Sequence, residues 1–166
     1  MKKDFLPTDY SIPETASNYL RFQDGVNKFR ILDSAVVGFE YFTSDNKPIR
    51  SREPFEETPN LKKDGKVKAF WAFPVWNYQT ESVQILEITQ KTIMNALKSL
   101  IDNEAWGSPV GKYNIVVVRK GEGLDTEYSV MPEPHSETLD DILSAYKDKP
   151  ANLDALFDNE DPFKKV

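Results

Sequence analysis

The chain has 166 residues, of which 39% are hydrophobic and 12% aromatic, enough for one domain with a substantial core. It contains no cysteine and a single histidine, His135, which excludes disulfides, thiolate zinc sites and a cysteine nucleophile, and we expect no metal or cofactor. The net charge of −6 argues against binding to a polyanion unless the charge is unevenly distributed.

The first 17 residues predict an extended N-terminal arm, because Pro7 and Pro13 interrupt them and no periodic pattern is present. The start, MKKDFLPTDY, lacks the apolar segment of a signal peptide, and no later run is apolar enough to span a bilayer. We therefore expect a cytoplasmic protein without membrane contact.

Residues 18–43 predict the first strands. NYLRFQDG alternates and stops at the turn dipeptide Asp24-Gly25, and VNKFRILDSAVVGFEYFT predicts one long strand or a bent pair of strands. Gly38 marks an expected bend or bulge in this stretch. Cations and apolar residues alternate at its start: Lys28 and Arg30 against Phe29 and Ile31.

Residues 44–65 predict a long connection, since they hold three prolines and no apolar period. Between residues 47 and 68 the charge is locally positive, with seven basic residues against four acidic ones. Local charge decides phosphate contacts, although for this stretch taken alone a solvated loop of mixed charge is the better explanation. The basic residues are Lys47, Arg50, Arg52, Lys62, Lys63, Lys66 and Lys68.

The stretch 66–78, KVKAFWAFPVWNY, predicts a strand with two distinct faces. One face is apolar and suits the core: Val67, Ala69, Trp71, Phe73 and Val75. The other mixes two lysines with three rings: Lys66, Lys68, Phe70, Trp76 and Tyr78. Rings beside cations suit stacked bases and a phosphate chain, whereas burial of both faces is the alternative. Pro74 predicts an edge or bulge near the middle, and a shift of phase there would make Trp71 and Phe73 the stacking residues.

The next residues predict a partner strand, a helix and two further strands. SVQILEI (82–88) returns as a strand, and TQKTIMNALKSLID (89–102) has a helical apolar stripe with Thr89 at the capping position. YNIVVVRK (113–120) and EYSVMPEP (127–134) predict the last strands. The glycine-containing connection between them begins with Arg119-Lys120.

Five strands with one helix between the third and the fourth predict an OB-fold, a mainly β, five-stranded Greek-key barrel, over residues 18–134. This fold binds oligonucleotides on its second and third strands and on the loops after the first and fourth strands. The face with the rings, the basic loop and Arg119-Lys120 all map to that surface.

Residues 135–166 differ in kind from the core, and residues 131–166 hold nine acidic residues against four basic ones. SETLDDILSAYK (136–147) predicts a short amphipathic helix with Ser136 as its cap. The acidic, sparsely apolar end predicts either a partner-binding tail that also competes with nucleic acid for the basic groove, or an ordinary solvated terminus. The candidate partner-binding residues are Leu156, Phe157, Asp158, Glu160, Asp161, Pro162 and Phe163.

Several stretches together resemble the single-stranded DNA-binding proteins of tailed bacteriophages: NYLRFQDGVNKFRIL, DNKPIRSRE, FWAFPVWNYQTESVQILEITQKTI, YNIVVVRKGEGLDTEYSV and the Asp-Pro-Phe ending. The resemblance implies an OB-fold that coats single strands during phage DNA replication, recombination and repair in the host cytoplasm. It also implies a tail that engages replication partners. The chain departs from the T-even zinc-containing members because it lacks cysteine. It also departs from tails that end at Pro-Phe, because Lys164-Lys165-Val166 follow Phe163.

The expected function is therefore sequence-independent binding of single-stranded DNA without catalysis. Rings at Phe70, Trp76 and Tyr78 would stack on bases, while the basic residues contact phosphates. A protein-interaction module whose aromatic groove receives a peptide, with possible self-association, is the alternative. A magnesium nuclease is disfavoured because the acidic pairs Glu56-Glu57 and Asp140-Asp141 suit solvent-facing positions.

Overall fold

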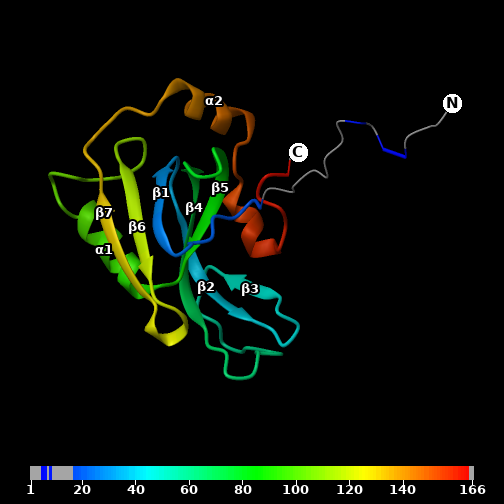
Figure 1. Ribbon diagram of the computed structural model, residues 1–166. Helices are drawn as coiled ribbons and strands as arrows, with labels where there is room; N and C mark the ends of the chain where they lie inside the picture. The colour runs from blue at the N-terminus through cyan, green and yellow to red at the C-terminus, as the bar shows by residue number, and fades with distance from the viewer. Residues whose placement is uncertain (1–4, 7, 9–16, 165–166) are drawn as a thin grey trace.

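The computed structural model describes residues 5–6, 8 and 17–164, so most of the expected N-terminal arm and the last two residues lie outside the described residues. The described part is mainly β, with an antiparallel sheet and few helices (Figure 1). The strands are β1 (Gly25–Ile31), β2 (Val36–Phe42), β3 (Pro48–Ser51), β4 (Lys68–Asn77), β5 (Ser82–Ile88), β6 (Asn114–Lys120) and β7 (Glu127–Pro132). The helices are α1 (Lys91–Ile101) and α2 (Asp140–Asp148), with short 3-10 helices η1 (Gly123–Asp125) and η2 (Leu153–Asp158).

Strand β4 is the centre of the sheet. One of its edges pairs with β2 and then with β1, and its other edge pairs with β5. The strand order is β3-β2-β4-β1-β6-β7, with β5 outside this path. Within residues 17–164 no ladder joins β5 to β7, so the sheet is open there, and α1 packs against β7.

The prediction of five strands was wrong in number, because the sheet has seven strands within residues 17–164. The bent pair expected in residues 26–43 is β1 and β2, which separate at residues 32–35. The predicted long connection contains β3, which pairs with β2, and a further bridge between Thr43 and Leu61. Four residues are too few to show a period of two, so β3 carries no recognisable pattern in the sequence.

Pro74 lies where β4 passes from one neighbouring strand to the next. Residues 68–72 pair with β2 and residues 75–77 pair with β1, and the Pro74 carbonyl accepts a hydrogen bond from the Leu32 amide in the corner between those strands. An antiparallel residue directs its nitrogen and its carbonyl toward the same neighbour. The missing N–H of proline therefore falls at the corner, where the ladder is already interrupted.

Gly38 was expected at a bend, but it lies inside β2 in regular pairing with Phe70 of β4. A Cβ at this position would lie 2.5 Å from the Ser51 carbonyl oxygen and 3.0 Å from the Phe157 ring. The glycine is required by close approach of β3 and of the C-terminal segment. A bulge is not the reason.

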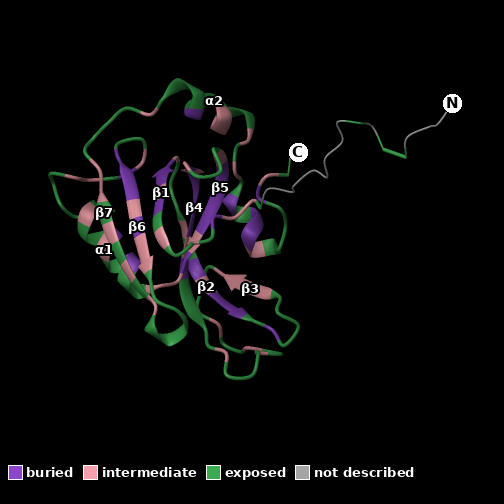
Figure 2. Ribbon diagram, in the orientation of Figure 1, coloured by how far each residue is buried: buried purple, intermediate pink, exposed green. Residues whose placement is uncertain are grey.

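The buried apolar residues form two clusters, one on each side of β4. The larger contains Phe29, Phe73 and Val75 and is covered by α1. The smaller contains Phe70, Ala72 and Ile85 and is covered by residues of the C-terminal segment, among them Leu153 and Leu156. Figure 2 shows burial along the middle of β1, β4 and β5 and exposure at the loops.

Both expected helix caps were wrong. α1 begins after Gln90 and α2 after Leu139, and neither capping residue makes a side-chain cap hydrogen bond. Ser136 lies outside α2 and bonds instead to a buried arginine of β1. The α2 helix is shorter than predicted because residues 133–139 remain an irregular connection.

Candidate nucleic-acid interface

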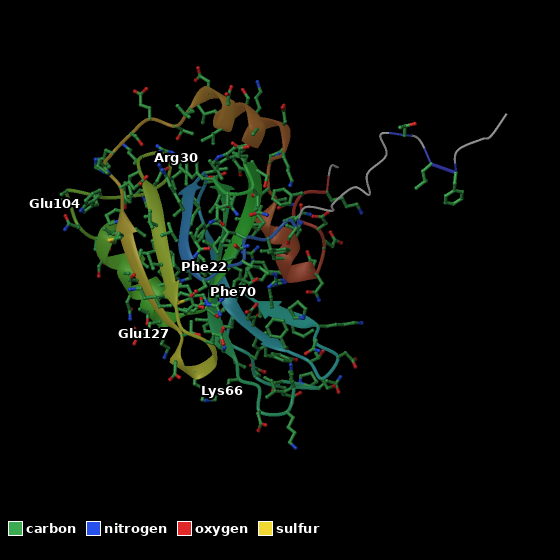
Figure 3. All side chains as sticks on the ribbon, viewed as in Figure 1. Phe22, Arg30, Lys66, Phe70, Glu104 and Glu127 are labelled. Atoms are coloured by element: carbon green, nitrogen blue, oxygen red, sulfur yellow. The ribbon has the colours of Figure 1, made fainter. Side chains whose placement is uncertain are left out.

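Side chains of β4 that alternate with the larger core form an outer face of the sheet. Trp71, Phe73 and Val75 pack with the larger core, so their neighbours point the other way. This matches the alternation predicted for residues 70–78, whereas Val67 and Ala69, which were expected on the core face, are exposed. The outer face contains Lys68, Phe70, Ala72 and Trp76 of β4, then Tyr78, and beside them Lys28 and Arg30 of β1. Figure 3 shows Arg30 toward α2, Phe70 near the middle and Lys66 toward the loop after β3.

Phe70 is fully buried, so the expectation of an exposed stacking ring at this position is wrong for the conformation described. The ring of Phe157 lies 5.8 Å from it, centroid to centroid, and Leu156 belongs to the same cluster. The Arg50 guanidinium lies 5.9 Å from the Phe70 centroid. The ring is thus sealed by residues more than 80 positions later in the chain.

Trp76 and Tyr78 are half-buried and remain partly accessible. Trp76 lies opposite Arg30 of β1 and Val83 of β5. The Lys28 ammonium lies 4.8 Å from the centre of the Tyr78 ring, and the Tyr78 hydroxyl donates to Asn114 Oδ1 at 2.8 Å. A ring beside a cation is present here, as the sequence predicted, at the β1 end of the outer face.

Arg50 is held by two carboxyl groups and is not free for phosphate in this conformation. Its Nη2 donates to Glu87 Oε2 at 2.8 Å, and its Nε lies 3.3 Å from Glu40 Oε2. Its side chain is 9% exposed. Burial and the adjacent Glu87 carboxyl raise the pKa of Glu40 to about 8, against the lowering effect of Arg50. The prediction of a solvent-facing phosphate ligand at Arg50 was therefore wrong for the conformation described.

Arg52 is exposed but engaged by the tail. Its Nη2 bonds to Asp154 Oδ1, and its guanidinium lies 4.2 Å from the centre of the Phe157 ring. An acid and a ring on one arginine are the two chemical features, negative charge and a π-face, that a nucleotide presents.

The acidic end is packed on the sheet over its described residues, rather than solvated throughout. Leu156 and Pro162 are buried, and Phe157 and Phe163 are half-buried. The Lys149 ammonium lies 4.3 Å from the Phe163 ring centre. The remaining candidate partner-binding residues are exposed: Asp158, Glu160 and Asp161. The apolar members of the predicted partner-binding set are thus engaged within the chain.

The remaining basic residues of the predicted site are exposed. They occupy the β2–β3 hairpin, the loop after β3 and the start of β4: Lys47, Lys62, Lys63, Lys66 and Lys68. Lys62 donates to Asn46 Oδ1 at 2.8 Å. Lys120, at the end of β6, is also exposed, whereas Arg119 is half-buried and donates to the Phe22 carbonyl at 3.3 Å. The β6–β7 turn and the loop after β3 lie at the same end of the molecule (Figure 1).

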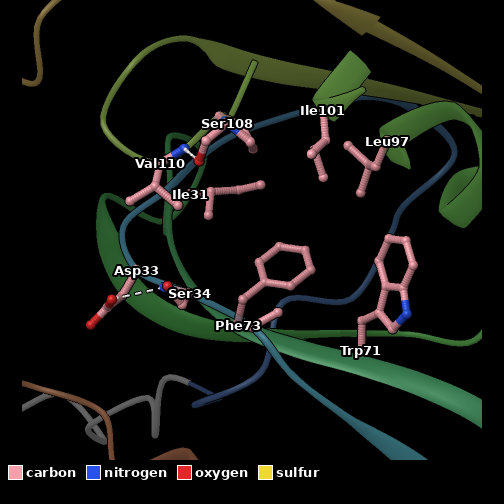
Figure 4. A pocket seen from close by; sticks show the side chains of 11 residues that line it. Ile31, Asp33, Ser34, Trp71, Phe73, Leu97, Ile101, Ser108 and Val110 are labelled. Atoms are coloured by element: carbon pink, nitrogen blue, oxygen red, sulfur yellow. Dashed lines mark hydrogen bonds between the residues drawn. The ribbon is translucent and has the colours of Figure 1, made fainter. Parts of the chain in front are cut away.

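An apolar pocket of about 210 Å³ lies on the other side of β4, between α1 and the β1–β2 corner (Figure 4). It is lined by Trp71, Phe73 and Leu97 among others, and its one ionisable lining residue is Asp33. Trp71 and Phe73 were the alternative stacking residues. A pocket with a carboxylate and no cation repels phosphate, which favours the outer face for a nucleic acid.

Lys28 and Arg30 also lie on the outer face, beside Tyr78 and Trp76, and neither was among the site residues predicted from the sequence. Lys28 and Arg30 alternate with Phe29 and Ile31 in the sequence, and this alternation predicts that the two cations lie on one face of a strand. The pairing of β1 with the far end of β4, which brings them to the rings, was not visible in the sequence.

Across the described ranges 5–6, 8 and 17–164, no three His, Asp or Glu side chains gather as a metal site. No helix in this part of the chain is long and apolar enough to cross a membrane. No family model, curated protein or solved structure matches the chain.

Proposed function

We propose that the sheet is a variant of the OB-fold. In this interpretation β1 and β2 together are its first strand, β4 and β5 its second and third, and β6 and β7 its fourth and fifth. The antiparallel pairing of β4 with both β1 and β2, the pairing of β1 with β6, and α1 between β5 and β6 support this assignment. The segment with β3 is then the loop after the first strand.

We infer that the outer face binds single-stranded DNA independently of sequence. One observation carries this proposal: cations of β1 lie beside rings at the end of β4. Lys28 lies beside Tyr78, and Arg30 lies beside Trp76. Each stacked base contributes about 1–3 kcal/mol, and every base has a π-face. Exposed lysines of the loop after β3 extend this row with phosphate contacts.

Binding of this kind has a function in phage DNA replication, recombination and repair in the host cytoplasm. Coating protects unpaired strands and pulls a duplex toward melting, because the protein binds only one of the two states. No chemical step is needed.

The C-terminal segment covers part of the same face, so it competes with DNA in this proposal. Single-stranded DNA can contact Phe70 or Arg52 only after η2 leaves the sheet. Phe157 covers both Phe70 and Arg52, and Asp154 hydrogen-bonds Arg52. Departure of η2 would expose Leu156, Phe157 and Phe163 to replication or recombination proteins. DNA binding and partner binding by the tail are then linked.

One observation favours a second candidate, a protein-interaction module. The chain already holds a peptide on the outer face, namely its own acidic and aromatic residues 153–163. A partner segment of similar composition would fit the same surface.

Fluorescence anisotropy of a labelled oligo-dT at two salt concentrations tests the proposal. We expect binding that weakens steeply with salt, because several cations release counterions from the strand. Binding of an acidic aromatic peptide with little salt dependence, and no binding of oligo-dT, would support the peptide module instead. Incubation with Mg²⁺ should leave the oligonucleotide intact, whereas cleavage would indicate a nuclease.

A further inference from the structure

Arg30 of β1 is 1% exposed, and none of the acidic side chains that the structure describes pairs directly with its charge. Its Nε donates to Thr138 Oγ1 at 2.7 Å, its Nη1 to Asn114 Oδ1 at 3.1 Å and to Ser136 Oγ at 3.0 Å, and its Nη2 to the Ser136 carbonyl. Within residues 17–164 no carboxylate oxygen lies within 4.0 Å of this guanidinium. A buried charge that is not paired with an opposite charge is costly, so neutral oxygens are an unusual complement for it.

Glu133 is the acid in this hydrogen-bond network, and its charge is shared between Arg30 and a second cation, Lys28. Glu133 Oε1 accepts from Asn114 Nδ2 at 3.1 Å and lies 3.1 Å from the Lys28 ammonium. These contacts, that of Asn114 first, lower the pKa of Glu133. Two cations, Lys28 and Arg30, therefore share one carboxylate, which leaves an excess of positive charge beside Trp76 and Tyr78.

Three of the four neutral oxygens come from one irregular connection, residues 133–139, which we call the strap, and the fourth is Asn114 Oδ1 of β6. It has no helix or strand, and Ser136 and Glu137 are exposed. Two backbone hydrogen bonds tie it to β6 and to the turn before β6, from Glu133 to the Asn114 carbonyl and from Ser136 to the Lys112 carbonyl. Glu133 is also held by Lys28 and Asn114, and the His135 ring packs against Trp106 and Tyr113. Displacing only residues 136–138 leaves these contacts in place and uncovers the guanidinium.

We propose that Arg30 is a phosphate-binding residue for the single strand on the outer face, and that the oxygens of Ser136 and Thr138 occupy its phosphate position in the free protein. The guanidinium fork binds phosphate oxygens bidentately and more strongly than it binds neutral hydroxyls. The position of Arg30 suits binding of a single DNA strand. Trp76 lies directly opposite Arg30, and Lys28 and Tyr78 form the next pair on the same face. This assignment rests on the proposed binding of single-stranded DNA, and it adds a subsite that is buried until the strap moves.

The test compares full-length variants in oligo-dT titrations over a range of salt concentrations. Ser136→Ala/Thr138→Ala removes two competing hydroxyls and leaves Arg30, so we expect binding about tenfold tighter. Ser144→Ala on the exposed side of α2 is the matched control and should bind as wild type. Arg30→Gln removes one phosphate contact, so the slope of log K against log salt should become shallower by about 0.7. A merely structural role for Arg30 would not change that slope.

The outcomes separate this inference from the proposed function. If wild type binds oligo-dT with steep salt dependence, but the hydroxyl double variant binds no more tightly, the phosphate site at Arg30 is wrong and the proposed function stands. This comparison decides even if Arg30→Gln fails to fold, because the strap residues lie at the surface. If wild type does not bind oligo-dT at low salt, the proposed function fails and the inference fails with it.

Discussion

The Arg52 guanidinium lies 4.2 Å from the centre of the Phe157 ring and hydrogen-bonds Asp154 on the preceding turn of η2. Arg52 of the basic loop thus contacts an acid and a ring of the C-terminal segment. Asp154 lies 102 positions after Arg52 in the sequence. The same Phe157 ring packs on Phe70 of β4. Loop, tail and outer face therefore meet at one place, and competition between tail and DNA is testable there.

Phe157→Ala should tighten binding of oligo-dT about tenfold. The substitution removes the ring that covers Phe70 and Arg52. The conformation with η2 on the outer face is therefore destabilised, whereas the DNA-bound conformation is not. Anisotropy titration at a single moderate salt concentration measures the effect. Leu143→Ala, at an exposed position of α2, is the control and should change nothing. Equal or weaker binding by Phe157→Ala would show that η2 does not compete.

Trp76→Ala and Tyr78→Ala should each weaken oligo-dT binding by about 1–3 kcal/mol, the contribution of one stacked base. Tyr78→Phe keeps the ring and loses only the hydroxyl bond to Asn114, so it should bind nearly as wild type. Thermal unfolding of each variant shows that the fold is retained. Equal losses for Tyr78→Phe and Tyr78→Ala would argue against stacking.

Lys66→Gln/Lys68→Gln should lower the salt dependence of binding. Each lost phosphate contact reduces the slope of log K against log salt by about 0.7 on a single strand, so the pair should reduce it by about 1.4. Lys91→Gln/Lys98→Gln on the exposed side of α1 is the charge-matched control. An equal reduction in both double variants would indicate a general effect of charge, without a local contact.

Glu40→Gln should flatten the dependence of stability on pH. The pKa of Glu40 is about 8 in the folded protein against 4.5 for the free group, so the folded state binds the proton more tightly. Its contribution is fully present below about pH 4.5 and is lost as the pH rises through about 8. Between pH 5.5 and 9 we expect the free energy of unfolding of wild type to fall by about 2–4 kcal/mol more than that of the variant. Urea unfolding at both pH values measures this, and parallel curves would contradict it.

Gly38→Ala should destabilise the protein by about 1–3 kcal/mol, the cost of an added methyl group in a packed site. The new Cβ would meet the Ser51 carbonyl of β3, a backbone atom that moves only if the strand moves. Ser34→Ala, in the exposed turn between β1 and β2, is the control. Unchanged stability of Gly38→Ala in urea would show that β3 is not held against β2 as described.

The sequence by itself determined the mainly β class, the helix between β5 and β6, and the two faces of residues 70–78. These follow from local periodicity, because the pleat of a strand alternates side chains whatever they contact. The end of α1 and the partner strand β5 were predictable for the same reason. The basic character of residues 47–68 was equally plain from composition.

Only the tertiary structure decided which residues of the outer face remain accessible. Phe70 is covered by η2, Arg50 is enclosed by Glu40 and Glu87, and Arg30 is covered by the strap. Each of these contacts joins residues at least ten positions apart, and two of the four join residues more than 80 positions apart, so no local pattern contains them. The pleat fixes the direction of a side chain, whereas its cover depends on how distant segments pack upon it.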